Sequence, residues 1–369
     1  MESSNATSTF LEDQEVDSQK FGLAALTKLL PIAIAITLTN GLVFVLFCKK
    51  RSLRNSSNYL LLSLSVCDFL TGTVSIPYFI IFSFPDIIQF GDFATHLMFV
   101  IHTFLAISSG YHILVITGEK YLAISKPIRH HLLRESTICK VSLGVWVISA
   151  GFALVPFAWW KLPFPIIQEV VYSASCLFMI FVVPYAFMIY SYIIMFKAIS
   201  KRKMPRQQND VQKTRFQQTK RDDKKCILVF ATMAAIYALC WMPYFIVMLI
   251  IHLRLFYLIL DEKSDMALDQ AAELFAIIRF MTSVVNPLLY TYFKRDFWRA
   301  LKALLRAKGL KIPSISGTIT TRSLMLSDSS SNVRQSIFSE EKVTLSAFDN
   351  VNPVTSDILE DGNISTTTV

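Results

Sequence analysis

Long apolar stretches recur along the chain and alternate with short polar segments. A helix needs roughly 20 apolar residues to cross the hydrocarbon core of a bilayer, and seven stretches have about that length. They are Leu29–Phe47, Tyr59–Phe82, Phe93–Thr117, Val141–Trp160, Val170–Phe196, Ile227–His252 and Met266–Tyr292. The pattern predicts an all-α integral membrane protein with a seven-transmembrane helix bundle.

Composition supports the same class. Hydrophobic residues make up 53% of the 369 residues and charged residues only 17%, whereas soluble proteins carry about 25% charged residues. A soluble core of this size could not bury such an excess of apolar side chains. The composition therefore excludes a chain of soluble domains.

The net charge of +9 is unevenly distributed between the segments that join the spans. Lysine and arginine gather after spans 1, 3 and 5, within 49–54, 126–134 and 201–221, and are sparse in the other joining segments. Basic segments favour the cytoplasmic side of a membrane. We therefore predict a multi-pass plasma-membrane protein with an extracellular N-terminus, and we interpret the charge as an orientation signal and not as a nucleic-acid site.

Three regions follow from this pattern. Residues 1–23 form an acidic extracellular tail with a glycosylation acceptor at Asn5. Residues 24–306 form the membrane domain, in which 200–222 is the longest loop, and 307–369 form a cytoplasmic tail. Both tails are too polar to fold alone and are predicted to be disordered. No cysteine lies in a predicted outer loop, so we expect no extracellular disulfide.

A carboxylate inside a span, Asp68, needs an explanation because a charge in the bilayer is costly. Polar residues of neighbouring spans are expected to surround it: Asn40, Ser109, Thr282, Ser283 and Asn286. Such oxygen ligands suit a small hard cation such as Na⁺. The alternative is a set of hydrogen bonds that only holds the helices together. No other cofactor is predicted.

Other charged residues sit at the span ends or deep within spans. Glu119-Lys120-Tyr121 ends span 3 and is either an ordinary interfacial end or an ion pair that breaks in a second state. His102 is either a hydrogen-bonded structural histidine or part of a binding pocket. Arg279 lies too deep to be free, so we expect it to meet Glu273 or an anionic ligand.

Ordered motifs run through all seven spans and beyond. They are Thr39-Asn40-Gly41, Leu62–Asp68, Glu119–Ile124 with Pro127, Trp146, Pro184 with Tyr192, Cys240-Trp241-Met242-Pro243, Asn286-Pro287-Leu288-Leu289-Tyr290 and Phe293–Phe297. Each motif alone is weak, but their order and their places in the spans are specific. In residues 24–306 the chain resembles a rhodopsin-like (class A) G-protein-coupled receptor.

The resemblance implies roles for many of these residues. It implies a sodium-linked site at Asp68 and a rotamer-sensitive Trp241 beneath a ligand pocket. It implies that Tyr192 and Tyr290 swing inward on activation. Residues assigned to activation and G-protein coupling are Glu119, Lys120, Tyr121, Tyr192, Pro243, Pro287 and Tyr290. Two departures stand out: Lys120 replaces the usual Arg and loses its planar fork, and Thr95 replaces the usual disulfide cysteine.

The resemblance also places the ligand pocket. Its expected lining is His102, Thr103, Cys176, Trp241, Tyr244, Phe245, Glu273 and Arg279. His102 stands where amine receptors carry Asp, and Phe280 stands where opsins carry the Schiff-base Lys, so both of those ligand classes are disfavoured. An aromatic pocket with an Arg suggests an anionic or amphipathic small molecule or a lipid as the ligand. A short peptide is an alternative ligand.

The segment after span 7 has apolar residues at helical spacing with a basic opposite face, which predicts an amphipathic eighth helix on the anionic inner leaflet. The alternative is packing against protein. Ser and Thr residues of the tail, such as Ser329–Ser331, offer a phosphorylated arrestin site or are ordinary tail composition. The ending Thr367-Thr368-Val369 fits a PDZ groove or is a chance match.

The predicted function is transduction of an extracellular ligand signal to heterotrimeric G proteins, with no enzymatic activity. One alternative is a receptor-like seven-span protein with weak or no G-protein coupling. The replacement of the usual Arg by Lys120 supports this alternative, because Lys offers fewer hydrogen-bond donors to a G protein. The other is a seven-span transporter or channel, for which Asp68, His102 and Arg279 would be part of a polar path.

Overall fold

The computed structural model describes residues 2–84, 91–203, 210–257 and 262–307. Within them the side chains of 2–21, 92, 262–265 and 269 are not described. The α-helices are α1 (Glu2–Lys49), α2 (Ser56–Leu70), α3 (Ile76–Phe82), α4 (Asp92–Ser125), α5 (Pro127–His131), α6 (Glu135–Ala153), α7 (Ile166–Leu177), α8 (Val183–Lys201), α9 (Asp210–Tyr257), α10 (Glu262–Ile278), α11 (Met281–Phe293) and α12 (Arg295–Ala307). No strand occurs in these ranges.

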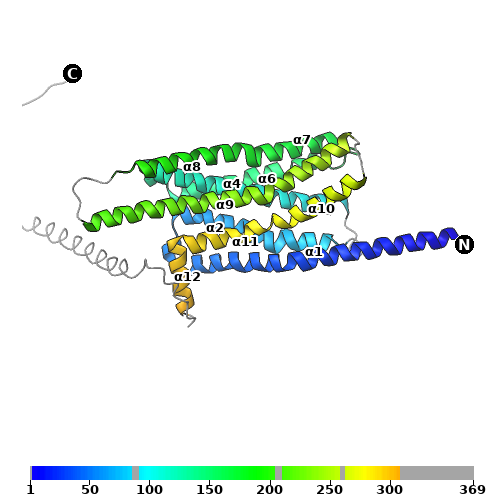
Figure 1. The fold of residues 1–369 in the computed structure, drawn as a ribbon, viewed down its shortest axis with the longest axis horizontal. Coiled ribbons are helices and arrows are strands. Elements are labelled where there is room, and N and C mark those ends of the chain that lie inside the picture. The colour runs from blue at the N-terminus through cyan, green and yellow to red at the C-terminus, as the bar shows by residue number, and fades with distance from the viewer. Residues whose placement is uncertain (1, 85–90, 204–209, 258–261, 308–369) are drawn as a thin grey trace, which may run out of the picture. The chain divides into compact units, whose positions relative to one another are not determined.

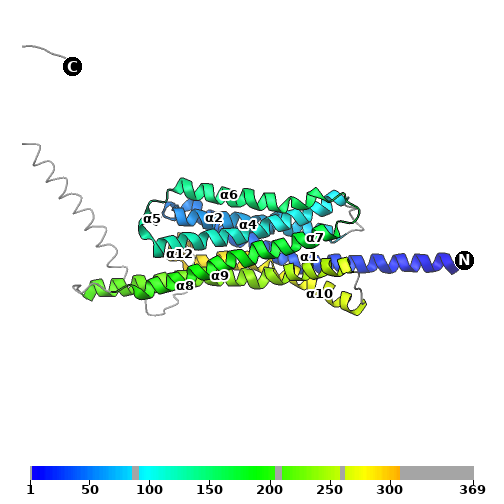
Figure 2. The same cartoon turned by 90° about the horizontal axis from the view of Figure 1, so that it is seen from above.

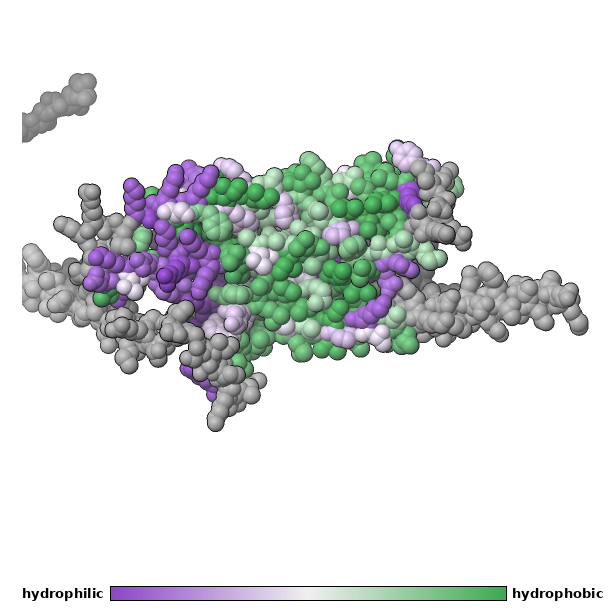
Figure 3. Space-filling model, viewed as in Figure 1, coloured by the Kyte–Doolittle hydropathy of each residue, from purple (hydrophilic) through white to green (hydrophobic). Residues whose placement is uncertain are grey.

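Seven helical segments of the described chain are long and apolar enough to cross a membrane, which confirms the seven predicted spans. They are Gly22–Lys49, Ser56–Phe82, Phe93–Ser125, Glu135–Ala158, Ile166–Lys201, Asp210–Tyr257 and Met266–Phe293. They run roughly parallel to one another (Figures 1 and 2). A hydrophobic band covers the middle of the visible face, with hydrophilic residues towards its ends (Figure 3). This band has the character expected for contact with lipid tails.

Helical structure extends further than predicted at two places. α1 begins at Glu2, so residues 2–23 continue the first span as helix and are not the unstructured tail that their polarity suggested. α9 begins at Asp210, so most of the predicted loop 200–222 is helical. Extending a helix from an existing one avoids the cost of nucleation, and Lys, Arg and Gln in the 210–222 segment are good helix formers.

Proline residues coincide with changes of helix type in three spans. Pro77 follows a π-helical turn, η2 (Thr71–Ser75), and Pro184 follows a second one, η4 (Phe178–Val182). Pro156 lies in a 3-10 helix, η3 (Val155–Ala158). Proline removes one backbone hydrogen bond and crowds the preceding turn. In these spans the disturbance takes the form of altered winding.

Close packing of α4 and α9 depends on a glycine. A Cβ atom on Gly110 would lie 2.9 Å from the Tyr237 hydroxyl, so only glycine leaves room for that ring. The hydroxyl donates a hydrogen bond to the Ala106 carbonyl oxygen at 2.7 Å. Tyr237 stacks on Trp241 one turn further along α9. This contact holds α9 against α4 at the depth of the predicted pocket.

The eighth helix, α12, packs partly on protein. It turns away from the direction of the spans at the end of α11 (Figure 1). Phe297 and Ala300 are buried, and the Phe297 ring lies 5.4 Å from the Tyr290 ring. The first turns of α12 therefore bury part of their apolar face against the bundle, and contact of the helix with the inner leaflet stays a prediction. A short 3-10 helix, η1 (Arg51–Leu53), also contacts α12.

Candidate functional site

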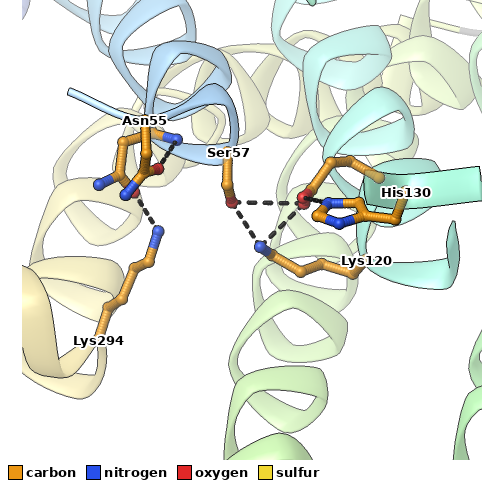
Figure 4. Close-up of polar contacts among 7 residues, drawn as sticks. Asn55, Ser57, Lys120, His130 and Lys294 are labelled. Carbon is orange, nitrogen blue, oxygen red and sulfur yellow. Dashed lines mark hydrogen bonds and ion pairs between the residues drawn. The ribbon is translucent and has the colours of Figure 1, made fainter. Parts of the chain in front are cut away.

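An ion-pair cluster closes the α12 end of the bundle, the end predicted to be cytoplasmic (Figure 4). Lys120 Nζ lies 2.8 Å from Glu119 Oε2 and donates a hydrogen bond to Ser57 Oγ on α2. His130 Nε2, from the short helix α5, lies 2.7 Å from Glu119 Oε1. Both oxygens of the buried Glu119 are therefore occupied. We call Ser57, Glu119, Lys120 and His130 the Lys120 cluster.

A second lysine lies beside this cluster. Lys294, between α11 and α12, donates a hydrogen bond to Asn58 Oδ1, and Asn58 Nδ2 in turn donates to the Leu53 carbonyl oxygen at 2.8 Å. Desolvation, followed by repulsion from Lys120, lowers the pKa of Lys294 to about 8. Unlike Lys120, this cation has a neutral amide as its hydrogen-bond partner.

Separate ion pairs hold α9 at the same end. Arg202 Nη1, just after α8, lies 2.6 Å from Asp223 Oδ2, and Arg202 Nη2 donates to the Ile124 carbonyl oxygen of α4 at 3.2 Å. Arg295 Nη2 of α12 lies 2.8 Å from Asp222 Oδ2. Movement of α9 away from α4 would therefore strain or break charge pairs that do not involve Lys120.

The two tyrosines assigned to activation have different partners. The Tyr192 hydroxyl lies 2.9 Å from Thr117 Oγ1 of α4, and the Tyr290 hydroxyl hydrogen-bonds Ser65 Oγ of α2. Tyr121 packs against a small apolar cluster of α8 and α9. In this conformation Tyr192 and Tyr290 do not form a pair, because each is bound to its own neighbour.

Asp68 lies buried in the middle of the bundle. Ser283 Oγ donates to its Oδ1 at 2.7 Å and Asn286 Nδ2 donates to its Oδ2 at 3.1 Å. The prediction that these two α11 residues meet Asp68 is correct.

The other three expected neighbours of Asp68 do not bond it. Asn40 Nδ2 donates to the backbone oxygens of Ile36 and Ser283. Thr282 Oγ1 accepts from Trp241 Nε1 at 3.2 Å. Ser109 Oγ has no hydrogen-bond partner within the described residues. The described chain also contains no group of three or more His, Cys, Asp or Glu side chains that could hold a metal ion.

The predicted pocket is partly assembled at the other end of the bundle. The Arg279 guanidinium carbon lies 4.1 Å from the Tyr244 ring centroid and 5.5 Å from that of Trp241. Phe245 packs beside both aromatic residues. Four of the eight expected lining residues therefore form one cluster, in which Arg279 is buried at 1% exposure.

Glu273 is not the partner of Arg279. Its Oε1 lies 2.9 Å from Lys28 Nζ of α1, and both side chains are substantially exposed. A side chain six residues earlier on α10 points elsewhere because six residues exceed one and a half helical turns. Of the two partners expected for Arg279, Glu273 or an anionic ligand, Glu273 is therefore excluded in this conformation.

The remaining lining residues lie to either side of the cluster. His102 packs 5.9 Å from the Phe280 ring and hydrogen-bonds Ser75 Oγ through Nδ1. Cys176 and Thr103 both interact with Tyr172 on α7. Tyr172 also lines a cavity of about 340 Å³ between η3 and α7, whose other lining residues are Phe152, Val155, Trp159, Ile167, Gln168, Val171 and Ser175. None of the predicted pocket residues lines that cavity.

Sequence reasoning missed two polar groups. Ser57 and His130 complete the Lys120 cluster, but they lie in polar segments where nothing distinguishes them. The second group is centred on His112 of α4, whose Nε2 lies 2.8 Å from Ser63 Oγ, while Ser63 Oγ accepts from Trp146 Nε1 at 2.9 Å. A histidine inside a span was a visible signal for that network.

All six cysteines are free. The side chain of Asn5, the phosphorylation region and the Thr367–Val369 ending lie outside the described residues, so these three predictions stay predictions.

Comparison with known proteins identifies the family. Residues 39–290 match the 7 transmembrane receptor (rhodopsin family). Over 283 residues the chain is 23% identical to somatostatin receptor type 1 of Rattus norvegicus. The aligned part makes up 72% of this chain and 67% of that receptor. It is 28% identical over 297 residues to adenosine receptor A2b of Mus musculus, an alignment that covers 73% of this chain and 85% of that receptor. It is 25% identical over 299 residues to the histamine H2 receptor of Rattus norvegicus, an alignment that covers 77% of this chain and 78% of that receptor.

These relatives are named for three different ligands, so likeness alone does not select one for this chain. All are receptors and none is named as an enzyme. The order of motifs, the seven spans and the family match agree over the same part of the chain. The protein belongs to the rhodopsin family of seven-transmembrane receptors and is a receptor, not an enzyme.

Proposed function

We propose that the protein transduces binding of an extracellular small molecule or lipid into activation of heterotrimeric G proteins. It does so at the plasma membrane, with its N-terminus outside and the Lys120 cluster facing the cytoplasm. The family supports the G-protein partner, and the aromatic surroundings of Arg279 favour a small molecule or lipid over an amine or retinal.

The single observation that carries the coupling proposal is the geometry of Lys120. Its ammonium group is held by Glu119 and Ser57 at the end of the bundle and lies 5.5 Å from the Phe230 ring of α9. Release of this cation as α9 moves would expose a donor to an incoming G protein. Lys has three donors and no planar fork, so we expect weaker coupling than an Arg would provide.

The test is ligand-free G-protein activation in cells across a panel of Gα subtypes. The native chain, Lys120→Ala and Lys120→Arg are compared at matched surface expression. We expect a native signal that Lys120→Ala abolishes and that Lys120→Arg raises by about tenfold or less, corresponding to roughly one additional charge-assisted hydrogen bond. Silence of all three variants on every Gα subtype would favour a receptor without coupling.

We also propose that Asp68 with Ser283 and Asn286 binds an allosteric sodium ion. The Asp68 carboxylate and the Ser283 hydroxyl oxygen are hard ligands of the kind that Na⁺ prefers. Asn286 donates to Asp68 through Nδ2 in this structure, so it would turn its amide to offer Oδ1 to the ion. Sodium should raise the Tm of the purified native chain by about 2–4 °C over the same concentration of choline, as expected for a ligand well above its Kd. Asp68→Asn should remove that difference. An equal Tm in sodium and choline would leave these bonds as interhelical contacts only.

Two further partners are proposed for the tail. Phosphorylation of Ser314–Ser331 would create a dense negative charge for arrestin, and the Thr367–Val369 ending would add a strand to a PDZ domain. A peptide ending in Val369 should bind a PDZ panel, and the same peptide with an amidated terminus should not. Glycosylation at Asn5 should disappear in Asn5→Gln, measured as a gel shift.

A further inference from the structure

A buried cation without a counter-charge lies at the His102 end of the bundle. Arg279 has 1% of its surface exposed. Its Nε donates to the Ala276 carbonyl oxygen at 3.2 Å, and its Nη1 has no hydrogen-bond partner among the described residues. No ion pair of the described residues involves Arg279, and Glu273, six residues earlier, pairs with Lys28. An uncompensated charge in such surroundings is costly unless a ligand completes it.

Aromatic rings surround the guanidinium. Its central carbon lies 4.1 Å from the Tyr244 ring centroid, 4.9 Å from that of Phe280 and 5.5 Å from that of Trp241. Ring faces attract a cation but supply no hydrogen-bond acceptor in the plane of the guanidinium. Nη1 therefore keeps a donor without an acceptor among the described residues, and a carboxylate is the group that a guanidinium edge binds through two parallel hydrogen bonds.

A second unpartnered nitrogen lies on the same aromatic ring. His102 contacts Phe280, and its Nε2 is buried with no hydrogen-bond partner in the described chain. Its Nδ1 bonds Ser75 Oγ. When the Ser75 hydroxyl donates to Nδ1, the ring proton lies on Nε2. Arg279 and His102 therefore each present an unpartnered buried nitrogen beside Phe280.

We propose that the ligand of this receptor carries a single carboxylate on an apolar body, and that Arg279 with His102 as second donor binds the carboxylate. This inference rests on the proposed function and deepens it. One guanidinium balances one negative charge, which favours a monoanion over a phosphate dianion. Trp241, Tyr244 and Phe245 offer their rings to the apolar body.

The same site has a direct connection to the activation residues. The Arg279 carbonyl oxygen accepts from Thr282 Oγ1 at 2.8 Å, and Thr282 Oγ1 accepts from Trp241 Nε1. Ser283, which bonds Asp68, is the next residue. A carboxylate that draws the guanidinium away from the Trp241 ring would thus act on a residue that is hydrogen-bonded to the start of α11.

The experiment measures ligand-dependent thermal stability of the purified full chain in lipid nanodiscs. The probes are decanoate and 2-naphthoate, each compared with its own primary amide. We expect at least one carboxylate to raise the Tm of the native chain by about 3 °C or more at saturation, and neither amide to do so. No difference between both carboxylates and their amides would overturn the inference.

Variants locate the binding group. Arg279→Lys should weaken the carboxylate effect by about tenfold because the bidentate geometry is lost, and Arg279→Gln should abolish it. His102→Ala should weaken it by about threefold to tenfold, the worth of one hydrogen bond. Lys28→Met removes a cation at the same end of the bundle and should leave the effect intact. An effect that persists in Arg279→Gln would also overturn the inference.

This readout is independent of signalling. A carboxylate effect in a chain that activates no Gα subtype would uphold the anion site and reject the proposed coupling. Basal G-protein activation in a chain that no carboxylate stabilises would uphold the proposed coupling and reject the anion site.

Discussion

Lys120 and Arg279 are both buried cations of one helix bundle, yet their surroundings differ in kind. Lys120 has a carboxylate at 2.8 Å and a hydroxyl as partners, and its carboxylate is shared with His130. Arg279 has one backbone oxygen and three aromatic rings. A complete set of partners stabilises one conformation until something displaces it. An incomplete set is typical of a site that a ligand completes.

The largest expected difference in stability between the two sites appears when each cation is replaced by methionine. Lys120→Met leaves the buried Glu119 without its main counter-charge and should lower the free energy of unfolding by about 3 kcal/mol. Arg279→Met loses ring contacts but removes an uncompensated charge, so it should change that free energy by less than about 1 kcal/mol.

Thermal or denaturant unfolding of both ligand-free variants in one detergent measures the difference. Equal destabilisation by the two substitutions would mean that Arg279 has a stabilising partner in the native bundle. The contrast between the two ends would then fail.

Lys294 is an intermediate case, a cation whose hydrogen-bond partner is a neutral amide. Its pKa is lowered to about 8, below the usual 10.4 of lysine. Between about pH 8 and 10.4 the unfolded chain therefore binds more protons than the folded chain, so stability should rise with pH in that window by about 2–3 kcal/mol.

Substitution of Lys294 tests the origin of this dependence of stability on pH, and substitution of an exposed lysine is the control. Lys294→Met should flatten the rise and should be more stable than the native chain at pH 7. Lys203→Met, at an exposed site after α8, should retain the native slope. A native stability that does not change or that falls between pH 8 and 10 would contradict the assignment.

The smallest effect is expected at the edge of the Lys120 cluster. His130 is about one-third exposed, and contacts of partly exposed ion pairs contribute at most about 1 kcal/mol. His130→Ala should therefore cost less than that in the free energy of unfolding and raise ligand-free G-protein activation by less than about fivefold. His131→Ala, on the same short helix, is the matched control and should change neither quantity.

The contents of the sites were only partly predictable. Asp68, Arg279 and His102 were visible because a polar residue stands out in an apolar span. Ser57 and His130 were not, because polar residues are ordinary at the ends of spans. The partners of Asp68 were right for the α11 residues Ser283 and Asn286, where spacing along one helix places both on the same side.

The amino-acid sequence by itself determined the fold class, the seven spans and the family, because bilayer thickness fixes the length of an apolar helix and the motifs occur in a set order. It did not determine which polar groups meet. Glu273 pairs with Lys28 and not with Arg279, Phe297 of α12 packs against Tyr290 of α11, and Asn40 donates to backbone oxygens. Only the tertiary structure decided these, because a hydrogen bond or ion pair needs atoms of different helices within about 3 Å, and that depends on how each helix is rotated and packed.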